Sequence, residues 1–173
     1  MAGVIMLSGP PGAGKTTIAR ELVKILPAPL SYIEGDSFWP YVTKSDGRDF
    51  RENFRIIMRA MTAAAVPFAR AGYDVLLDFS VPPGFLATIQ KILKEVPLDY
   101  VMLRPSLSVC ESRAATRAEG KIANYGQLRQ FYALFAESDN YTISDDGAEA
   151  PIMAARVREG LAAGRFRVSQ SSE

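Results

Sequence analysis

The sequence predicts an α/β fold of three layers, in which a parallel sheet is flanked by helices. Short apolar runs alternate with amphipathic helical patterns along the chain, and this order is typical of parallel βαβ units with helices on both faces. The chain has 173 residues, 48% of them hydrophobic, which is enough for one full core. We therefore expect a single domain over residues 1–168, followed by a polar tail over residues 169–173 that frays.

The first apolar run, residues 4–7, predicts a buried strand that leads into a glycine-rich loop. Residues 9–17 read Gly-Pro-Pro-Gly-Ala-Gly-Lys-Thr-Thr and match the phosphate-binding pattern G-x-x-x-x-G-K-[ST]. Glycine permits positive φ and leaves no Cβ between backbone N–H groups and an anion. A helical pattern follows, and the N-terminal dipole of a helix favours negative charge. A chance glycine-rich turn is the alternative, but the order of strand, loop and helix favours a phosphate site.

The loop also predicts which groups meet the phosphates. Lys15 can reach the β- and γ-phosphates of a nucleotide, and the Thr16 hydroxyl can ligate Mg²⁺. We expect contacts with the nucleotide along the whole loop: Gly9, Pro10, Pro11, Gly12, Ala13, Gly14, Lys15, Thr16 and Thr17. The loop by itself indicates only that a phosphate tail is bound.

The composition excludes several kinds of site and partner. Lys and Arg number 20 and Asp and Glu 19, so the net charge of +1 gives no bulk attraction for nucleic acid. The absence of His excludes a His general base and any zinc site that contains His, which leaves proton abstraction to a carboxylate. The single Cys110 excludes internal disulfides, and the apolar N-terminal run is too short for a signal sequence or a membrane span. We expect a cytoplasmic protein with no membrane partner.

Two further strands are predicted beside the first, and an aspartate stands at the end of each. Residues 30–33 lead to Asp36, and residues 73–78 end at Asp78. In open parallel sheets, ligands bind beyond the carboxyl ends of the strands. A kinase needs one carboxylate that accepts the proton of the attacking hydroxyl and another that helps to hold Mg²⁺. We predict these roles for the two aspartates; the alternatives are that Asp36 caps the next segment and that Asp78 is a structural acceptor for backbone or threonine hydroxyl groups.

Between these strands we expect an irregular loop over residues 37–49, because it carries Pro, Gly and polar side chains. A long helical pattern follows, which Pro67 is expected to kink or interrupt and Gly72 to end. Its apolar positions are predicted to lie near one face: Phe50, Phe54, Ile57, Met61 and Phe68.

The second half of the chain continues the alternation. A helix packs Phe85, Ile89, Ile92, Leu93 and Val96, a fourth strand runs over residues 98–104, and residues 108–111 fit a capping box. An amphipathic helix is predicted around Leu128, Phe131, Tyr132 and Phe135, and a short fifth strand over residues 141–143. After a turn at residues 145–147, Pro151 opens a last helix that packs Met153, Val157 and Leu161.

A basic segment follows the fourth strand. Arg113 and Arg117 are four residues apart and share one face of the predicted helix, and Lys121 follows. Guanidinium groups stabilise the charge that spreads over the γ-phosphoryl oxygens during transfer. We predict this role for Arg117, whereas Arg113 can instead stack on a purine. The alternative is an ordinary solvated helix face.

Aromatic residues gather in the sequence near the two aspartates. Phe38, Trp39, Tyr41 and Phe79 fit either ordinary packing or an apolar pocket for the phosphoryl acceptor. Cys110 has apolar helical neighbours and is expected to be an inert core residue.

Together, these residues resemble those of the small P-loop kinases. The likeness rests on the loop at residues 9–17, on Gly35-Asp36-Ser37-Phe38, on the segment at residues 70–78 and on the helix with Arg113 and Arg117. It covers most of the chain from Val4 to about Leu161, although only the phosphate loop is highly specific. The order is most similar to the chloramphenicol phosphotransferase-like group, with gluconate kinases and zeta-toxin-type kinases as more distant relatives.

The resemblance implies a P-loop kinase fold with a five-stranded parallel sheet, ATP and Mg²⁺ as cofactors, and transfer of the γ-phosphate to a hydroxyl group. It implies that Asp36 is the general base, that Arg113 and Arg117 belong to a lid at about residues 106–125, and that adenine lies between the lid helix and residues 145–147. The lid continues with Gly120-Lys121 in place of another arginine, and residues 37–49 match no acceptor-specific pattern.

The leading hypothesis is an ATP-dependent kinase of a small hydroxyl compound, with Lys15, Asp36 and Arg117 as catalytic residues and Thr16 and Asp78 at the metal. A second hypothesis is a nucleotide or polynucleotide end kinase, although the near-neutral charge argues against a polynucleotide. A third is a non-catalytic regulatory module that uses ATP occupancy as a switch. The sequence leaves open the acceptor, the oligomeric state, the preference for ATP over GTP, and which aspartate is the base.

Overall fold

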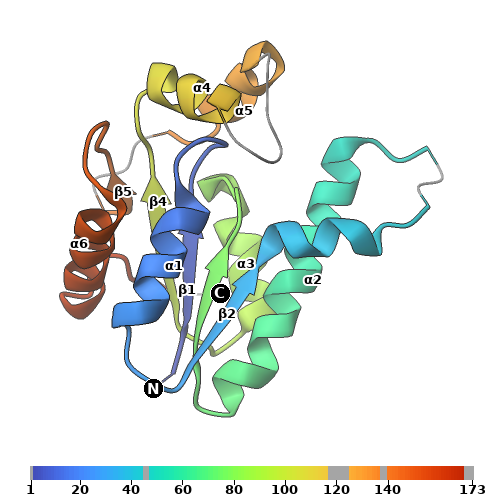
Figure 1. The fold of residues 1–173 in the computed structure, drawn as a ribbon. Coiled ribbons are helices and arrows are strands. Elements are labelled where there is room, and N and C mark those ends of the chain that lie inside the picture. The colour runs from blue at the N-terminus through green and yellow to red at the C-terminus, as the bar shows by residue number, and fades with distance from the viewer. Residues whose placement is uncertain (1, 45–46, 117–124, 137–139, 170–173) are drawn as a thin grey trace.

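The computed structural model describes residues 2–44, 47–116, 125–136 and 140–169, whose fold is shown in Figure 1. In this part of the chain, five strands form one sheet in the order β2-β3-β1-β4-β5. The strands are β1 Val4–Ser8, β2 Leu30–Glu34, β3 Asp74–Asp78, β4 Leu98–Leu103 and β5 Thr142–Ile143. All pairings between these strands are parallel, which confirms the predicted α/β class and its five-stranded sheet.

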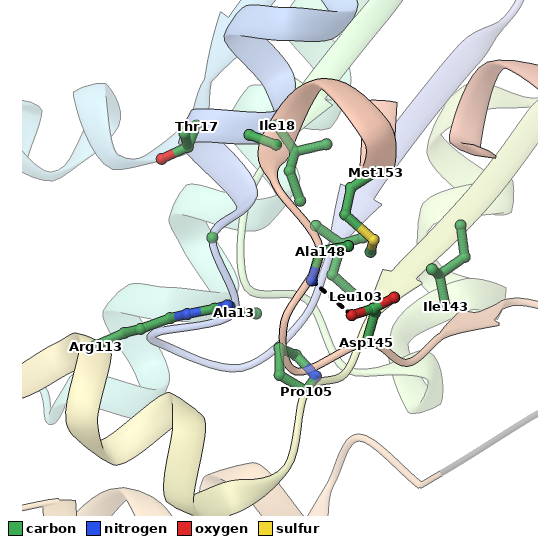
Figure 2. Close-up of a pocket in the computed structure, with 12 residues that line it drawn as sticks. Ala13, Thr17, Ile18, Leu103, Pro105, Arg113, Ile143, Asp145, Ala148 and Met153 are labelled. Atoms are coloured by element: carbon green, nitrogen blue, oxygen red, sulfur yellow. Dashed lines mark hydrogen bonds between the residues drawn. The ribbon is translucent and has the colours of Figure 1, made fainter. Parts of the chain in front are cut away.

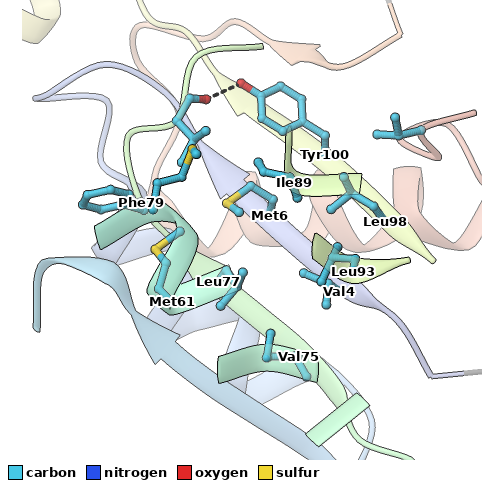
Figure 3. Packing of buried hydrophobic residues seen from close by; sticks show 14 of the residues in the cluster. Val4, Met6, Met61, Val75, Leu77, Phe79, Ile89, Leu93, Leu98 and Tyr100 are labelled. Carbon is cyan, nitrogen blue, oxygen red and sulfur yellow. Dashed lines mark hydrogen bonds between the residues drawn. The ribbon is translucent and has the colours of Figure 1, made fainter. Parts of the chain in front are cut away.

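Helices cover both faces of the sheet (Figure 1). One face carries α1 Lys15–Ile25 and α6 Ala150–Ala162, and the other carries α2 Phe50–Arg70 and α3 Leu86–Leu93. Alternate residues of β1 enter the two cores: Val4 and Met6 pack toward α2 and α3, whereas Ile5 and Leu7 pack toward α1 and α6. Figure 3 shows Val4 and Met6 among the core residues on the α2 and α3 side. The middle strand is therefore buried on both faces, as its continuous apolar run predicts.

A separate pair of short helices lies beyond the carboxyl ends of the strands (Figure 1). These are α4 Leu107–Thr116 and α5 Arg129–Ala133, the latter preceded by the 3₁₀ helix η3 at Tyr125–Leu128. They enclose a small core of their own, in which Cys110 and Ala114 are fully buried beside Tyr132. This pair includes the described part of the predicted lid, whereas residues 117–124 lie outside the described residues, as do residues 170–173 of the predicted tail.

The structure differs from several local predictions. Pro67 does not interrupt α2, because this residue lies in the last turn, where a missing N–H removes only one hydrogen bond of a helix held by its buried face. Phe50 and Phe68, near the two ends of α2, are 61% and 45% exposed, whereas Phe54 between them is buried. The expected irregular loop begins instead with the 3₁₀ helix η1 at Gly35–Tyr41.

The predicted capping box is wrong, and the amphipathic helix predicted around residues 128–135 is shorter than expected. Because α4 begins at Leu107, Ser108 lies inside the helix, and the Glu111 carboxylate accepts a hydrogen bond from Arg129 at 2.9 Å. The apolar segment at residues 128–135 forms the end of a 3₁₀ helix and a short α-helix rather than one continuous helix. Pro151 does open the last helix, whose buried face includes Met153 and Val157. Across the described residues, no helix combines the length and the apolar character needed to cross a membrane.

Candidate active site

The phosphate loop takes a conformation that requires its glycines. Gly9, Gly12 and Gly14 have φ values of 145°, 82° and 87°. A Cβ on Gly9 would lie 2.2 Å from the Leu103 carbonyl oxygen, and a Cβ on Gly12 would lie 2.2 Å from that of Cys110. The loop therefore packs backbone to backbone against β4 and α4, and neither position has room for a side chain. This close packing fixes the path of the loop before α1 begins.

Lys15 is the first residue of α1 and the one charged residue in the loop sequence at residues 9–17. It is buried, with only 7% of its surface exposed. Its Nζ donates a hydrogen bond to the Pro10 carbonyl oxygen at 3.2 Å, which places the ammonium group across the loop. The loop also ends at the N-terminus of α1, where the helix dipole favours an anion. The ammonium group and the helix N-terminus thus face one place, which suits a phosphate chain.

Asp78 and Thr16 meet beside this place. The Thr16 hydroxyl donates a hydrogen bond to Asp78 Oδ2 at 2.7 Å, and the Tyr32 hydroxyl approaches the same oxygen at 3.4 Å. Burial raises the pKa of Asp78, although Lys15 and the Thr16 hydrogen bond act in the opposite direction. Burial also raises the pKa of Tyr32, and the Asp78 charge adds to that effect.

These groups fit a Mg²⁺ ion. Because Thr16 donates its proton to Asp78, the lone pairs of its hydroxyl oxygen remain available to a cation, and the carboxylate supplies a second hard oxygen ligand. Within the described residues, no cluster of three or more His, Cys, Asp or Glu side chains can hold a metal ion. Proteins usually bind Mg²⁺ through one or two protein oxygens together with phosphates and water, and Thr16 and Asp78 supply two such oxygens.

Asp36 lies next to this group. Strand β2 pairs Glu34 with Asp78, and β3 in turn pairs Asp78 with Leu7, so the chain reaches Asp36 at the carboxyl edge of the sheet. The Asp36 charge is among the causes that raise the pKa of Asp78. The side chain of Asp36 is exposed, and no hydrogen bond to it is found among the described residues, so it does not cap η1. A water-facing carboxylate in this place is open to an incoming hydroxyl.

A cavity of about 220 Å³ lies on the other side of the loop (Figure 2). Its wall is mostly apolar and includes Ala13, Ile18, Leu103, Pro105, Ile143, Ala148, Ala150 and Met153. Thr17, Arg113 and Asp145 add polar groups at the same cavity. The cavity joins the loop, α4 and the segment at residues 145–147, which is where the resemblance places adenine.

Hydrogen bonds hold Arg113 and the turn that carries Asp145 and Asp146 in place beside this cavity. Arg113 Nη2 donates a hydrogen bond to the Asp146 carbonyl oxygen at 3.3 Å, and Figure 2 shows its side chain reaching toward Ala13. Asp145 Oδ1 accepts hydrogen bonds from the backbone N–H groups of Gly147 at 2.9 Å and Ala148 at 2.7 Å. The Gly147 N–H, the Arg156 side chain and the Ala148 N–H lower the pKa of Asp145 to about 2.

The structure therefore brings most of the predicted site residues to one edge of the sheet, with Lys15, Thr16, Asp36 and Asp78 on one side of the loop and Arg113 on the other. Arg117 and Lys121 lie outside the described residues. Tyr32 was not predicted to take part, because nothing in the sequence separates it from an ordinary strand aromatic. Cys110 is fully buried, burial raises its pKa to about 11, and its thiol is therefore unreactive, as expected.

Comparison with known proteins identifies the family. Residues 4–138 match the model of the AAA_33 family, described as an AAA domain. The chain belongs to this family. A cytidylate kinase of Pyrobaculum arsenaticum is 42% identical over 79 residues, which cover 42% of this chain and 42% of that protein. The AAA_33 chain thus spans less than half the length of this curated relative.

Solved structures share the fold of this AAA_33 domain. A sugar kinase from Janibacter sp. is 22% identical with a TM-score of 0.70, and the match covers 94% of this chain and 95% of that one. A gluconokinase from Sinorhizobium meliloti is 20% identical with a TM-score of 0.67, covering 93% and 92%. The predicted P-loop kinase fold is therefore confirmed. These matches do not test the narrower resemblance to chloramphenicol phosphotransferases, which stays a prediction.

Proposed function

We propose that the protein transfers the γ-phosphate of ATP to a hydroxyl group of a small molecule. The observation that supports this most is the arrangement at the carboxyl edge of the sheet, where a phosphate loop, a paired Thr16 and Asp78, and an exposed Asp36 lie together. A domain that only binds ATP needs the loop, but it has no need of a second, water-facing carboxylate beside it. The kinase fold of the solved neighbours agrees with this proposal.

On the donor side, each group has a task that its position supports. The apolar cavity beside Arg113 binds the adenine ring, and the loop and Lys15 hold the phosphates. Thr16 and Asp78 would hold Mg²⁺, which when bound offsets charge on the β- and γ-phosphate oxygens. Arg117, which lies outside the described residues, is proposed to add positive charge near the transferred group.

On the acceptor side, Asp36 is the proposed general base. Its carboxylate accepts the proton of the acceptor hydroxyl while the hydroxyl oxygen forms a bond to the γ-phosphorus. The bond between that phosphorus and the oxygen it shares with the β-phosphate breaks, and ADP leaves. Phe38 and Trp39 are half-buried beside Asp36 in η1, and we propose that they line an apolar part of the acceptor pocket.

A second candidate acceptor is a nucleotide. The similarity to a cytidylate kinase favours it, since 42% identity over 79 residues exceeds the identity to the sugar kinase and the gluconokinase. The matched region is less than half of either protein, however, and it does not extend over the whole site. The two candidates differ only on the acceptor side, so the donor-side proposal is common to both.

The test is a coupled ADP-release screen over sugar acids, nucleosides, nucleoside monophosphates, amino alcohols and hydroxylated antibiotics. We expect ADP release that depends on one acceptor class and is abolished by Lys15→Ala, with the fold retained by circular dichroism. Retained transfer by the folded Lys15→Ala variant would contradict the proposal. Tight ATP binding with no turnover across the whole panel would instead favour a regulatory module that uses ATP occupancy as a switch.

A further inference from the structure

Gly35, the residue before Asp36, is a glycine for reasons of space. Its φ lies outside the left-handed region, so another residue could adopt the same backbone conformation. A Cβ at this position, however, would lie 2.5 Å from Cδ2 of Phe79, 2.6 Å from its Cγ and 2.7 Å from its Cβ. Non-bonded carbon atoms do not approach this closely, and one of the three atoms is the Cβ of Phe79, which cannot move without its backbone. Either the η1 backbone or the Phe79 backbone would have to move.

The Phe79 ring has little freedom to give way. It is 4% exposed and stacks on the Phe54 ring of α2, with centroids 5.3 Å apart and planes at 16°. Its own backbone N–H donates a hydrogen bond to the Leu7 carbonyl oxygen at 3.3 Å, which continues the β1–β3 ladder past Asp78. The ring is therefore held between the α2 core and the backbone of Gly35.

The chain after Phe79 is held by hydrogen bonds between two buried hydroxyl groups, those of Ser8 and Tyr100, and the backbone of Val81. Ser8 Oγ donates to the Val81 carbonyl oxygen at 2.6 Å and accepts from the Val81 N–H at 2.9 Å. The Tyr100 hydroxyl donates to the same carbonyl oxygen at 2.7 Å, as the dashed line in Figure 3 shows. All three residues have no exposed surface, so the hydrogen bonds act without competition from water. The strands β1 and β4 thus fix the segment that carries Phe79.

We infer that Phe79 is a positioning residue for Asp36, acting through its contact with the Gly35 backbone. Asp36 has no hydrogen bond of its own to the described residues, so the path of η1 determines where its carboxylate lies. That path is set where Gly35 rests on the Phe79 ring. The inference rests on the proposed role of Asp36 as general base, and it explains why the residue before the base has no side chain.

The test is Gly35→Ala, with Gly84→Ala as its matched control. A Cβ on Gly84 meets no atom within 4 Å and its backbone is not left-handed, so the control adds the same methyl group without a clash. Trp39 lies in η1 and stacks on Phe50 at 5.0 Å, and as the one tryptophan of the chain it reports any shift of η1 through its fluorescence. Three quantities are measured: Trp39 emission, the calorimetric Kd for ATP, and kcat for ADP release with the best alcohol of the panel as acceptor.

For Gly35→Ala we expect altered Trp39 emission, an ATP Kd within about twofold of wild type and a loss in kcat of about 10- to 100-fold, the range that a displacement near 1 Å can cause. Gly84→Ala should match wild type in all three. Unchanged emission, or altered emission with unchanged kcat, would overturn the inference.

If Gly35→Ala does not fold, Phe79→Leu, which keeps a buried apolar side chain, takes its place. This variant should likewise lower kcat and leave the ATP Kd nearly unchanged. If Asp36→Asn itself leaves kcat unchanged, the failure belongs to the proposed function and not to the role of Phe79.

Discussion

Asp78→Asn is predicted to separate stability from function. Only 3% of Asp78 is exposed, and its two hydrogen-bond donors, Thr16 and Tyr32, converge on the same oxygen, Oδ2. The amide oxygen of asparagine can accept both, so neither hydroxyl group loses its acceptor. Burial raises the pKa of Asp78 despite the opposing attraction of Lys15, so folding favours the neutral form of this side chain. A neutral side chain should therefore be tolerated better than the carboxylate.

The sign of the effect follows from linkage. A carboxyl group whose pKa is higher in the folded than in the unfolded state makes the protein less stable as pH rises from the unfolded pKa to the folded pKa. Wild type should lose stability over that window, which begins near pH 4, whereas Asp78→Asn should not. At neutral pH the variant should unfold at the same temperature as wild type or higher; for a chain of this length, each 1 kcal/mol changes Tm by about 2–4 °C.

Function, in contrast to stability, should be impaired in Asp78→Asn. Loss of the carboxylate should remove the dependence of nucleotide binding on Mg²⁺, measured by calorimetry with a non-hydrolysable ATP analogue, and should lower kcat by about 100-fold or more. Asp99→Asn is the control, because Asp99 is also buried and burial also raises its pKa. Asp99 lies near the start of β4, where it forms an ion pair with Arg167 at 3.0 Å, and it takes no part in the phosphate loop. A fall in Tm of more than about 4 °C for Asp78→Asn, with Mg²⁺ dependence intact, would refute the reasoning and identify Asp78 as a structural acceptor.

Three more predictions test other parts of the site. Gly12→Ala should abolish ATP binding by calorimetry, because its Cβ would lie 2.2 Å from the Cys110 carbonyl oxygen; normal binding would show that the loop does not need this close contact. Ala150→Leu, which extends a side chain into the cavity of about 220 Å³, should weaken ATP binding but leave inorganic tripolyphosphate binding unchanged; equal effects on both ligands would mean that the cavity does not hold the base. The pKa of Asp145 is about 2 in the folded protein, below its ordinary value of 3.8, so its contribution to stability is present above about pH 4 and is lost as pH falls toward 2. Thermal unfolding of Asp145→Asn should lack this loss, and parallel curves for variant and wild type would contradict the assignment.

The parts of the fold that depend on local pattern could be predicted from the sequence. Continuous apolar runs predict β1, β3 and β4, because strands that are buried on both faces carry apolar residues at successive positions. The helical period of the apolar residues predicts the helices between these strands. The phosphate loop is recognisable because its glycines, Lys15 and Thr16 are adjacent in the chain. The two aspartates follow from the rule that ligands bind beyond the ends of parallel strands.

What could not be predicted depends on residues that meet only in the folded chain. Tyr32 reaches Asp78 from 46 positions away, and Arg129 reaches Glu111 from 18, which removes the carboxylate that the capping box needed. The contact between Gly35 and Phe79 is likewise invisible in sequence, where Gly35 reads as an ordinary turn glycine. Phe50 and Phe68 fit the helical period of α2, yet both lie near its ends and are exposed, which the period alone does not predict.

The most direct test of the central claim is the single-turnover rate of γ-phosphate transfer by Asp36→Asn, measured with saturating ATP and the acceptor found in the screen. Asparagine preserves the shape of the side chain but cannot accept the proton. The rate should fall by about 100-fold or more, in keeping with the usual contribution of a general base, while the calorimetric Kd for ATP changes little. An unchanged transfer rate would contradict the claim that Asp36 is the base of a kinase.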